Sequence, residues 1–445
     1  MKDAMQVQNE GPWKPNSKVS SEDARVLTNS SRITGFAKMN VKDRVQALIN
    51  KKLLSQKESS YLINPGALPL DQADKFIENC IGGYTLPLGI ATNFIIDNEE
   101  IFIPMAVEES SVIAAASYGA KLARSGGGFF SEPTQTITTC QVQFFASPKI
   151  NIAELFHDSV KTKIFEIASA CHPKLAERGG GIKDVELRML SKPGYYVIHI
   201  HVDTREAMGA NIVNAIAEEV GSCLSNLLPC CVGSKILTNL ALHRITKVKC
   251  EIDYSVLERE NFSGEEVAQR ICSVWEFADL DPFRAVTHNK GVMNGIDPIV
   301  IATGNDWRAV DAGCHAYASI SGVYKPLTRW FINADNRLQG EIELPIAVGT
   351  VGGVTRLHPT ASTCLKLMGS PSSAKLSAII ASVGLAQNLS AIRALGCEGI
   401  QKGHMALHEK NLEMMRFYDH LPSISILAQP TNLSSEEVQK LHKSL

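Results

Sequence analysis

A lysine and an aspartate stand at opposite ends of one short apolar run, and charges placed in this way could take part in catalysis. Lys290 belongs to the segment 288–291 (HNKG), and Asp306 belongs to the segment 304–308 (GNDWR). The glycines near Lys290 predict a loop, and the apolar residues 298–303 predict a buried strand. The alternative is purely structural: Lys290 is a solvated loop lysine, and Asp306 caps a helix that begins near Trp307.

Two adjacent carboxylates, Glu108 and Glu109, are predicted to open a helix over residues 108–124. The helix dipole favours a carboxylate there by about 0.3–1 kcal/mol. Small side chains occupy residues 114–117, 119 and 120, so another backbone can approach this helix closely. The dipole accounts for one carboxylate, and we expect the other to face inward.

The composition is that of an ordinary globular protein of 445 residues, which is long enough for two or three domains. Lys and Arg total 44 against 46 for Asp and Glu, so no basic excess favours a nucleic-acid or anionic-membrane partner. Residues 1–26 lack the apolar core of a signal peptide, and charged residues interrupt the apolar region 86–107. Eleven scattered cysteines favour reduced thiols and a cytoplasmic location.

The middle of the chain has the element order of a ferredoxin-like domain. We predict strand 141–146, helix 152–170, strands 184–190 and 195–203, helix 210–228 and strand 235–242. Before this region we predict helices at 41–54 and 70–79 and strands at 88–95 and 101–105. From Arg244 the composition returns to that of the first part, so the small unit is predicted to be inserted into a larger domain.

A nucleotide, if bound, would be bound unconventionally, because the chain has neither a Gly-x-Gly-x-x-Gly after a strand nor a Gly-x-x-x-x-Gly-Lys-Ser/Thr loop. The segment 203–211 (DTREAMGAN) lies between a predicted strand and a predicted helix. Its small residues could let a pyrophosphate meet the amides at the helix start. A tight turn that needs Gly209 for its geometry explains the segment equally well.

Two amides occur in an apolar region near the end of the chain. Gln387 and Asn388 lie within a predicted helical hairpin over residues 372–395, which follows a glycine run at 348–353. Buried amides need hydrogen-bond partners, either a substrate or neighbouring backbone.

Two pairs of histidines have spacings that metal sites use. His404 and His408 share a helix face, and His199 and His201 alternate on a strand. Neither pair has an evident third ligand, so we expect no metal site. His404 is better suited to proton delivery, because the unperturbed pKa of histidine is about 6.5.

Five separated motifs resemble those of one enzyme family in the same order. They are residues 78–82 (ENCIG), 107–111 (VEESS), 288–291, 304–308 and 403–405 (GHM). The chain thereby resembles 3-hydroxy-3-methylglutaryl-CoA (HMG-CoA) reductase, specifically the soluble class II form of bacteria and archaea. The resemblance runs from about residue 36 to residue 408.

The resemblance implies reduction of a thioester to a primary alcohol with two nicotinamide hydrides, through a hemithioacetal and an aldehyde, to give mevalonate and CoA. It implies that Lys290 stabilises the oxyanion and that Asp306 orients Lys290 and keeps it charged. Glu109 would supply a proton, and His404 on a carboxy-terminal flap would protonate the CoA thiolate.

The resemblance also implies binding residues on both sides of the reaction. For HMG-CoA they are Glu78, Ser111, Arg284, Asn294, Gln387 and Asn388. For the cofactor they are His172, Glu206, Met208, Gly209, Asn211, Asn239, Gly349, Gly352 and Gly353.

The fold implied is α+β, with a large discontinuous, mainly helical substrate domain and an inserted ferredoxin-like (βαββαβ) cofactor domain. The expected boundaries are 1–35 for a mobile arm, 36–138 with 244–399 for the large domain, 139–243 for the NAD(P)-binding domain and 400–445 for the flap. The family works as a homodimer with its site at the subunit interface, and we expect the same here.

Two departures from the family bear on the cofactor. The family's Asp-Ala-Met-Gly begins with Glu206 here, which puts the contact of that aspartate in doubt. NADH-using members have an aspartate where this chain has His172, and His172 with Lys174 or Arg178 could accept a 2′-phosphate. We therefore expect NADPH in preference to NADH. Mevalonate oxidation, the reverse reaction, and CoA-thioester binding without catalysis remain as alternatives.

Overall fold

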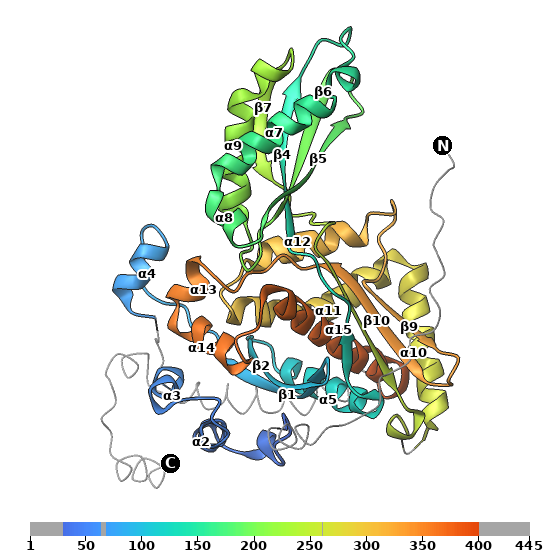
Figure 1. Cartoon of the computed structure of the whole chain (residues 1–445). Helices are drawn as coiled ribbons and strands as arrows, with labels where there is room; N and C mark the ends of the chain where they lie inside the picture. The colour runs from blue at the N-terminus through green and yellow to red at the C-terminus, as the bar shows by residue number, and fades with distance from the viewer. Residues whose placement is uncertain (1–29, 64–67, 260, 400–445) are drawn as a thin grey trace, which may run out of the picture. The chain divides into compact units, whose positions relative to one another are not determined.

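The computed structural model describes residues 30–63, 68–259 and 261–399 and combines helices with two β-sheets (Figure 1). The α+β class is therefore confirmed. The chain divides into a unit Met1–Gly396 and a unit Cys397–Leu445, and the first contains all the elements below.

A six-stranded sheet has the order β2-β1-β3-β8-β10-β9. The strands are β1 (Leu88–Ile96), β2 (Glu99–Ala106), β3 (Phe129–Ser131), β8 (Ile245–Ile252), β9 (Thr328–Ile332) and β10 (Leu338–Pro345). The two predicted strands at 88–95 and 101–105 are confirmed. β3 pairs with β8, with Phe129 opposite Cys250, so strands on either side of residues 132–244 lie in one sheet. This pairing is what we expect if residues 132–244 are inserted into one larger domain.

The inserted residues form a second sheet with the order β5-β6-β4-β7. Its elements are β4 (Ile137–Phe145), α6 (Ile152–Leu155), α7 (Asp158–Cys171), α8 (Pro173–Glu177), β5 (Gly181–Met189), β6 (Tyr195–Asp203), α9 (Ala210–Leu227) and β7 (Cys231–Leu237). The predicted order of strands and helices along the chain is confirmed, although β4 begins before the predicted residue 141 and β7 ends before the predicted residue 242. Alternate residues such as Ile198 and Ile200 join the helices in a separate core, so the other face of β6 carries the remaining side chains.

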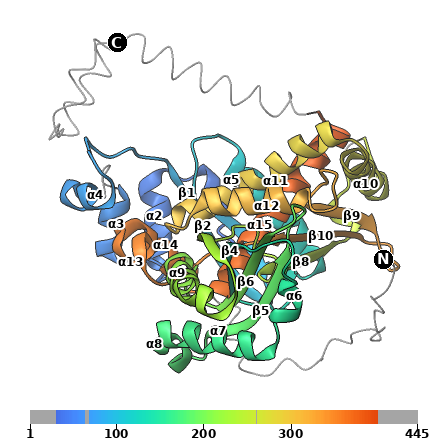
Figure 2. The ribbon, with the colours of Figure 1, turned by 90° about the horizontal axis from the view of Figure 1, so that it is seen from above.

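One long helix, α15 (Ser373–Cys397), occupies the centre of the main unit and replaces the predicted hairpin. It is buried almost all round, because α5 (Val112–Ala123) and α11 (Pro282–Ala302) pack on it through glycines. A methyl group at Gly119 would overlap the Ala386 carbonyl oxygen, and one at Gly295 would lie 2.8 Å from that of Val383. α15 is long and apolar enough to cross a membrane, but 83% of its apolar window is buried inside the protein, as in a core helix. Figure 2 shows α11 beside α15.

The prediction of a loop at Lys290 and a strand at 298–303 was wrong, because one helix, α11, contains both. Asp281 caps this helix by accepting from the Phe283 and Arg284 amides. A short apolar run looks alike in a buried strand and in a buried helix. The predicted cap is confirmed, since the Asp306 carboxylate accepts from the Ala309 amide at 3.1 Å at the start of α12 (Trp307–Ala318).

Two further boundaries differ from the predictions. α5 begins at Val112, so Glu108 and Glu109 precede the helix instead of opening it. Ser31 is fully buried and bonds Phe94 and Glu100, so the last residues of the predicted mobile arm pack on the sheet. The remaining helices are η2 (Phe36–Lys38), α2 (Val41–Asn50), α3 (Gln56–Ile63), α4 (Leu70–Phe76), η3 (Arg124–Gly126), η4 (Tyr254–Val256), α10 (Gly264–Leu280), α13 (Gly353–Leu357) and α14 (Pro359–Leu367).

Candidate active site

The centre of the candidate site is an ion pair between Lys290 on α11 and Glu109 in the turn before α5. The Lys290 Nζ lies 3.2 Å from the Glu109 Oε2. The side chains remain 62% and 42% exposed, so the pair faces an open surface. An exposed pair of this kind contributes at most about 1 kcal/mol to the free energy of folding. Stability alone is therefore a weak explanation for the presence of this ion pair.

The turn that carries Glu109 is conformationally unusual. Ser111 caps α5 with a φ of 74°, in the left-handed region that non-glycine residues rarely adopt. Such a conformation costs of order 1–3 kcal/mol and often marks a functional site. It directs the chain from β2 into α5 so that Glu109 meets α11.

Lys290 belongs to a stripe along the less buried face of α11. Asn294 and Asp297 follow at helical spacing, four and seven residues on, and both are partly exposed. Burial, together with the nearby Asp311, raises the pKa of Asp297 to about 7. One Asp297 carboxyl oxygen is buried and has no hydrogen-bond partner among the described residues. This face therefore continues from the ion pair to a half-buried carboxyl that stays largely protonated below pH 7.

Asp306 is not near Lys290 within one chain. Helix α11 continues for 12 residues beyond Lys290 to Ala302, which is about 18 Å at 1.5 Å per residue. The chain then turns, with the Asn305 amide bonded to the Val300 carbonyl oxygen, so Asp306 begins α12 near that end of α11 and not beside Lys290. The Asp306 carboxylate instead contacts Arg308 at 3.3 Å and caps α12.

Two other predicted substrate residues lie on α15, in the core. The Asn388 carboxamide bonds Thr328, Trp330 and His288, and the residue is only 1% exposed. A substrate contact by Asn388 would require it to exchange one of these partners. The buried Gln387 Oε1, by contrast, has no hydrogen-bond partner in the described structure. Gln387 is therefore the better candidate of the two amides.

The remaining predicted substrate residues lie in more accessible positions. Arg284 is half-buried near the start of α11, and burial lowers its pKa. Glu78 is exposed in a segment without helix or strand, residues 77–87, where Ile81 and Tyr84 are also almost fully exposed. Two large apolar side chains exposed within four residues of each other could contact another surface.

The predicted cofactor loop between β6 and α9 folds as a tight turn. Gly209 caps α9 with a φ of 100°, and a Cβ there would lie 2.5 Å from the Thr204 methyl group. The turn therefore requires glycine. Asn211 is exposed in the first turn of α9, beside the amide hydrogens that a phosphate could use. The two readings of this segment are compatible.

A buried arginine joins this loop to the second glycine run. Arg244 is fully buried and donates to the carbonyl oxygens of Ala207, Met208 and Val348. Burial lowers its pKa to about 10. A Cβ at Gly349 would lie 2.5 Å from the Met208 amide nitrogen, so the two loops approach closely only because residue 349 is glycine.

Two further polar residues brace the same loops. The Asn305 Oδ1 accepts from the Gly349 amide at 2.8 Å. The Glu206 carboxylate accepts from the Ser373 amide at 2.6 Å and from the Thr350 hydroxyl at 3.2 Å. Glu206 therefore holds the loop against the start of α15. The aspartate that the family has at this position has a side chain one carbon shorter.

The other predicted cofactor residues are more scattered. His172 lies between α7 and α8, and its buried Nε2 has no hydrogen-bond partner in the described structure. Asn239 is exposed in the segment after β7, and Gly352 and Gly353 precede and start α13. His404 lies outside the described residues.

Comparison with known proteins decides the family. The family model of hydroxymethylglutaryl-coenzyme A reductase matches residues 40–409. The chain belongs to this family. HMG-CoA reductases reduce HMG-CoA to mevalonate, so the chain is an oxidoreductase and its resemblance to the class II form is confirmed.

Individual HMG-CoA reductases match most of the chain. The enzyme of Archaeoglobus fulgidus is 44% identical over 388 residues, which are 87% of each protein. A probable HMG-CoA reductase of Borreliella burgdorferi is 34% identical over 375 residues, covering 82% of this chain and 81% of that protein. The class II enzyme of Streptococcus pneumoniae bound to NADPH has a TM-score of 0.78 at 38% identity, covering 81% of this chain and 99% of that chain.

Sequence reasoning missed three residues that shape this candidate site. They are Arg244, Asn305 and Asp297, which respectively brace two loops, fix Gly349 and extend the Lys290 face. Asn305 stands within a recognised motif and could have been singled out. Arg244 and Asp297 stand out only when their burial in the structure is known.

Proposed function

We propose that this chain reduces HMG-CoA to mevalonate and CoA with two molecules of NADPH, at a site centred on Lys290 and Glu109. The ion pair between these residues carries the proposal. It joins side chains 181 positions apart in the sequence, and the family resemblance independently assigns both to catalysis. An exposed lysine with no catalytic role needs no such partner.

The residue roles follow from the charge that each step creates. When bound, the nicotinamide cofactor supplies the hydride for each reduction. Lys290 donates to the thioester oxygen and stabilises the negative charge that develops there. The carbon–sulfur bond of the hemithioacetal then breaks, and His404 protonates the CoA thiolate. Glu109 delivers a proton to the oxygen of the aldehyde as it becomes the alcohol.

A second copy of the chain completes this site. Lys290 needs a carboxylate to stay oriented and charged, and Asp306 of its own chain lies too far along α11. The Asp306 of a partner subunit can approach Lys290 if two copies pack through the faces that bear α11. Four large apolar side chains at the end of α10 and the start of α11 are exposed and suit that contact, namely Phe277, Leu280, Phe283 and Val286.

The cofactor side fits a dinucleotide with an additional phosphate. The unpartnered Nε2 of His172 and the amides at the start of α9 offer hydrogen-bond donors. Arg205 passes close to Gly179, and Lys174 and Arg178 are exposed on or beside α8. These cations favour the 2′-phosphate of NADPH, where an aspartate would repel it.

Turnover tests the proposal directly. Oxidation of NADPH by the full chain in the presence of HMG-CoA is followed by absorbance, for the wild type and for Lys290→Ala. We expect wild-type turnover, and a loss of about 10²–10³-fold in kcat in the variant. Lys163→Ala is the matched control, because it breaks another exposed ion pair, with Glu166. No oxidation by the wild type contradicts the function, and unchanged activity of Lys290→Ala contradicts only that residue's role.

The cofactor preference needs its own variant. His172→Asp should lower kcat/KM for NADPH by about tenfold relative to NADH, because the carboxylate would repel the 2′-phosphate. His157→Asp, at the exposed cap of α7, is the control. An unchanged ratio for His172→Asp contradicts the assignment of His172.

A further inference from the structure

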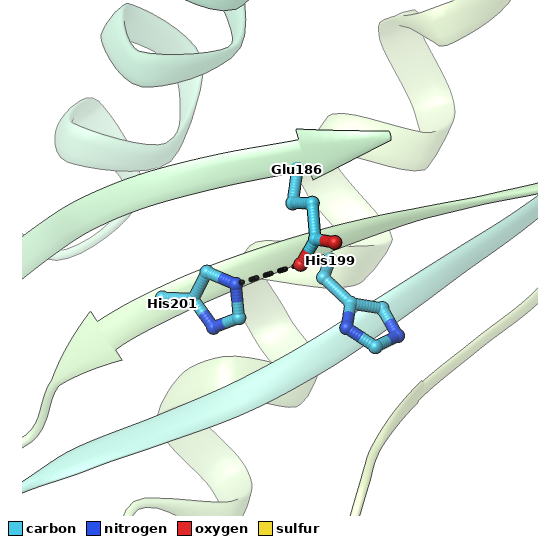
Figure 3. A group of neighbouring side chains, drawn as sticks. All are labelled: Glu186, His199 and His201. Atoms are coloured by element: carbon cyan, nitrogen blue, oxygen red, sulfur yellow. Dashed lines mark ion pairs between the residues drawn. The ribbon is translucent and has the colours of Figure 1, made fainter. Parts of the chain in front are cut away.

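The face of the inserted sheet opposite its helices carries a cluster of metal-ligating side chains. Glu186 on β5 lies directly across from His199 on β6, and His201 follows His199 on the same face (Figure 3). This placement follows from the strand alternation, because Ile198 and Ile200 point into the core. The expectation that these two histidines lack a third ligand was wrong, since the neighbouring strand supplies Glu186.

The three side chains converge on one point. The His201 Nε2 lies 3.7 Å from the Glu186 Oε2, and one ligand atom from each residue lies within 4.8 Å of the other two. The opposite ring nitrogen of His201, Nδ1, is hydrogen-bonded to the Thr139 hydroxyl at 2.8 Å. Histidine ligands are typically oriented by such a bond from the nitrogen that does not bind the metal.

The histidines are also in the chemical form that binds metal ions. Burial lowers the pKa of His199 to about 4, with a further contribution from the Arg188 charge, and burial also lowers the pKa of His201. An unprotonated ring nitrogen of an imidazole can bind a metal ion. Glu186 is about half exposed, so its carboxylate can turn towards them.

We propose that Glu186, His199 and His201 bind one divalent cation of the Zn²⁺ class and so join β5 to β6. Two imidazoles and one carboxylate, with water in the fourth position, form a tetrahedral donor set suited to Zn²⁺ or Co²⁺. Mg²⁺ and Ca²⁺ prefer oxygen ligands. Binding requires the three donors to close in by about 1 Å, to reach metal–nitrogen distances of about 2.1 Å.

Binding also requires His199 to exchange its present partners. Its Nε2 contacts Gln141 at 2.8 Å and Arg188 at 3.2 Å. Both partners are side chains on neighbouring strands, so they can withdraw without moving the sheet. Arg188 lies two residues after Glu186 on β5, so it would then be close to the Glu186 carboxylate, which also binds the metal.

Co²⁺ is the probe that separates this site from the cysteines. The full chain, freed of metal with a chelator, is titrated with Co²⁺, and the absorption spectrum reports the ligands. We expect one equivalent bound with nitrogen and oxygen ligation, without a thiolate-to-cobalt charge-transfer band, and displaced by Zn²⁺. The same addition should raise the melting temperature, because the ion binds only the folded chain.

Three variants and two controls decide the outcome. Loss of an outer-shell partner typically costs 10–100-fold in metal affinity, so Glu186→Gln, His199→Gln and His201→Gln should each weaken binding by about 100-fold or more. His157→Gln, and Cys230→Ser combined with Cys231→Ser, should leave binding unchanged. Absence of binding, wild-type affinity in the three variants, or a spectrum of thiolate ligation would overturn the proposal. Because the readout is binding, its failure is distinguishable from failure of the reductase activity.

Discussion

The proposed cofactor side and the proposed substrate side of this enzyme differ in how much of their geometry one chain supplies. On the cofactor side, Arg244, Glu206 and Asn305 are hydrogen-bonded to backbone on neighbouring loops, so the turn before α9 is held from several directions. On the substrate side, Lys290 and Glu109 face an open surface, and Asp306 lies at the far end of α11.

The difference indicates what each side still needs. A dinucleotide can meet a loop that is already in place. The thioester requires groups that one copy of the described chain does not bring together. Substitutions on the substrate side should therefore change activity more than stability, whereas those on the cofactor side should change stability first.

The largest expected effect is on the substrate side. Glu109→Gln should lower kcat by about 10³-fold, because the amide cannot deliver a proton. Its free energy of unfolding should change by less than about 1 kcal/mol, because the ion pair with Lys290 is exposed. The adjacent Glu108→Gln is the control, and steady-state kinetics with urea unfolding measures both quantities. A comparable loss of kcat in Glu108→Gln would show that the effect is not specific to Glu109.

The converse is expected at Arg244. Arg244→Met should lower the free energy of unfolding by about 3 kcal/mol, because it leaves buried carbonyl oxygens of two loops without donors. The KM for the cofactor should rise, while turnover at saturating cofactor stays close to that of the wild type. Arg329→Met, at an exposed arginine, should change stability by no more than about 0.5 kcal/mol. Unchanged stability of Arg244→Met would show that the two loops hold their positions without it.

Asp297 supplies a pH-dependent test of the face that it shares with Lys290. Its pKa rises from 3.8 in the unfolded chain to about 7 in the folded protein, so folding retains a proton. Stability is therefore lost as pH rises from about 4 to 7. Asp297→Asn abolishes that loss and should raise the free energy of unfolding by about 1–2 kcal/mol at pH 8. The gain should vanish near pH 3, as unfolding at several pH values would show, and a pH-independent gain would exclude protonation of Asp297 as its cause.

The smallest effect is expected for Glu206→Gln. The amide keeps an oxygen that can accept from the Ser373 amide, so only the charge at the start of α15 is lost. That loss should cost about 0.3–1 kcal/mol in urea unfolding. Glu218→Gln, exposed on α9, should cost less. A loss above about 2 kcal/mol would show that Glu206 bears more of the cofactor side than its two hydrogen bonds indicate.

Local patterns predicted some features correctly. The strand order of the inserted sheet, the Asp306 cap and the need for Gly209 each depend on residues that are close in sequence or on a simple alternation. The roles of Lys290 and Glu109 came from family resemblance, and their contact could not have been measured from spacing.

Other features depend on tertiary structure. The run 298–303 was misread because a short apolar segment is compatible with a strand or a buried helix, and Pro298 lies within the helix. From the sequence alone, Arg244 is indistinguishable from an exposed arginine, and only the structure shows that it is buried. Glu186 becomes a third ligand only through the register between β5 and β6.

A mixed-dimer assay tests most directly whether Lys290 and Asp306 of different subunits meet. Lys290→Ala and Asp306→Asn chains, each nearly inactive alone, are co-expressed with different tags, and HMG-CoA reduction is measured. Random pairing makes half of the dimers mixed, and each mixed dimer has one intact site of two, so about a quarter of wild-type activity is predicted. Activity no higher than that of the separate variants would contradict the account, because both residues would then act from the same chain.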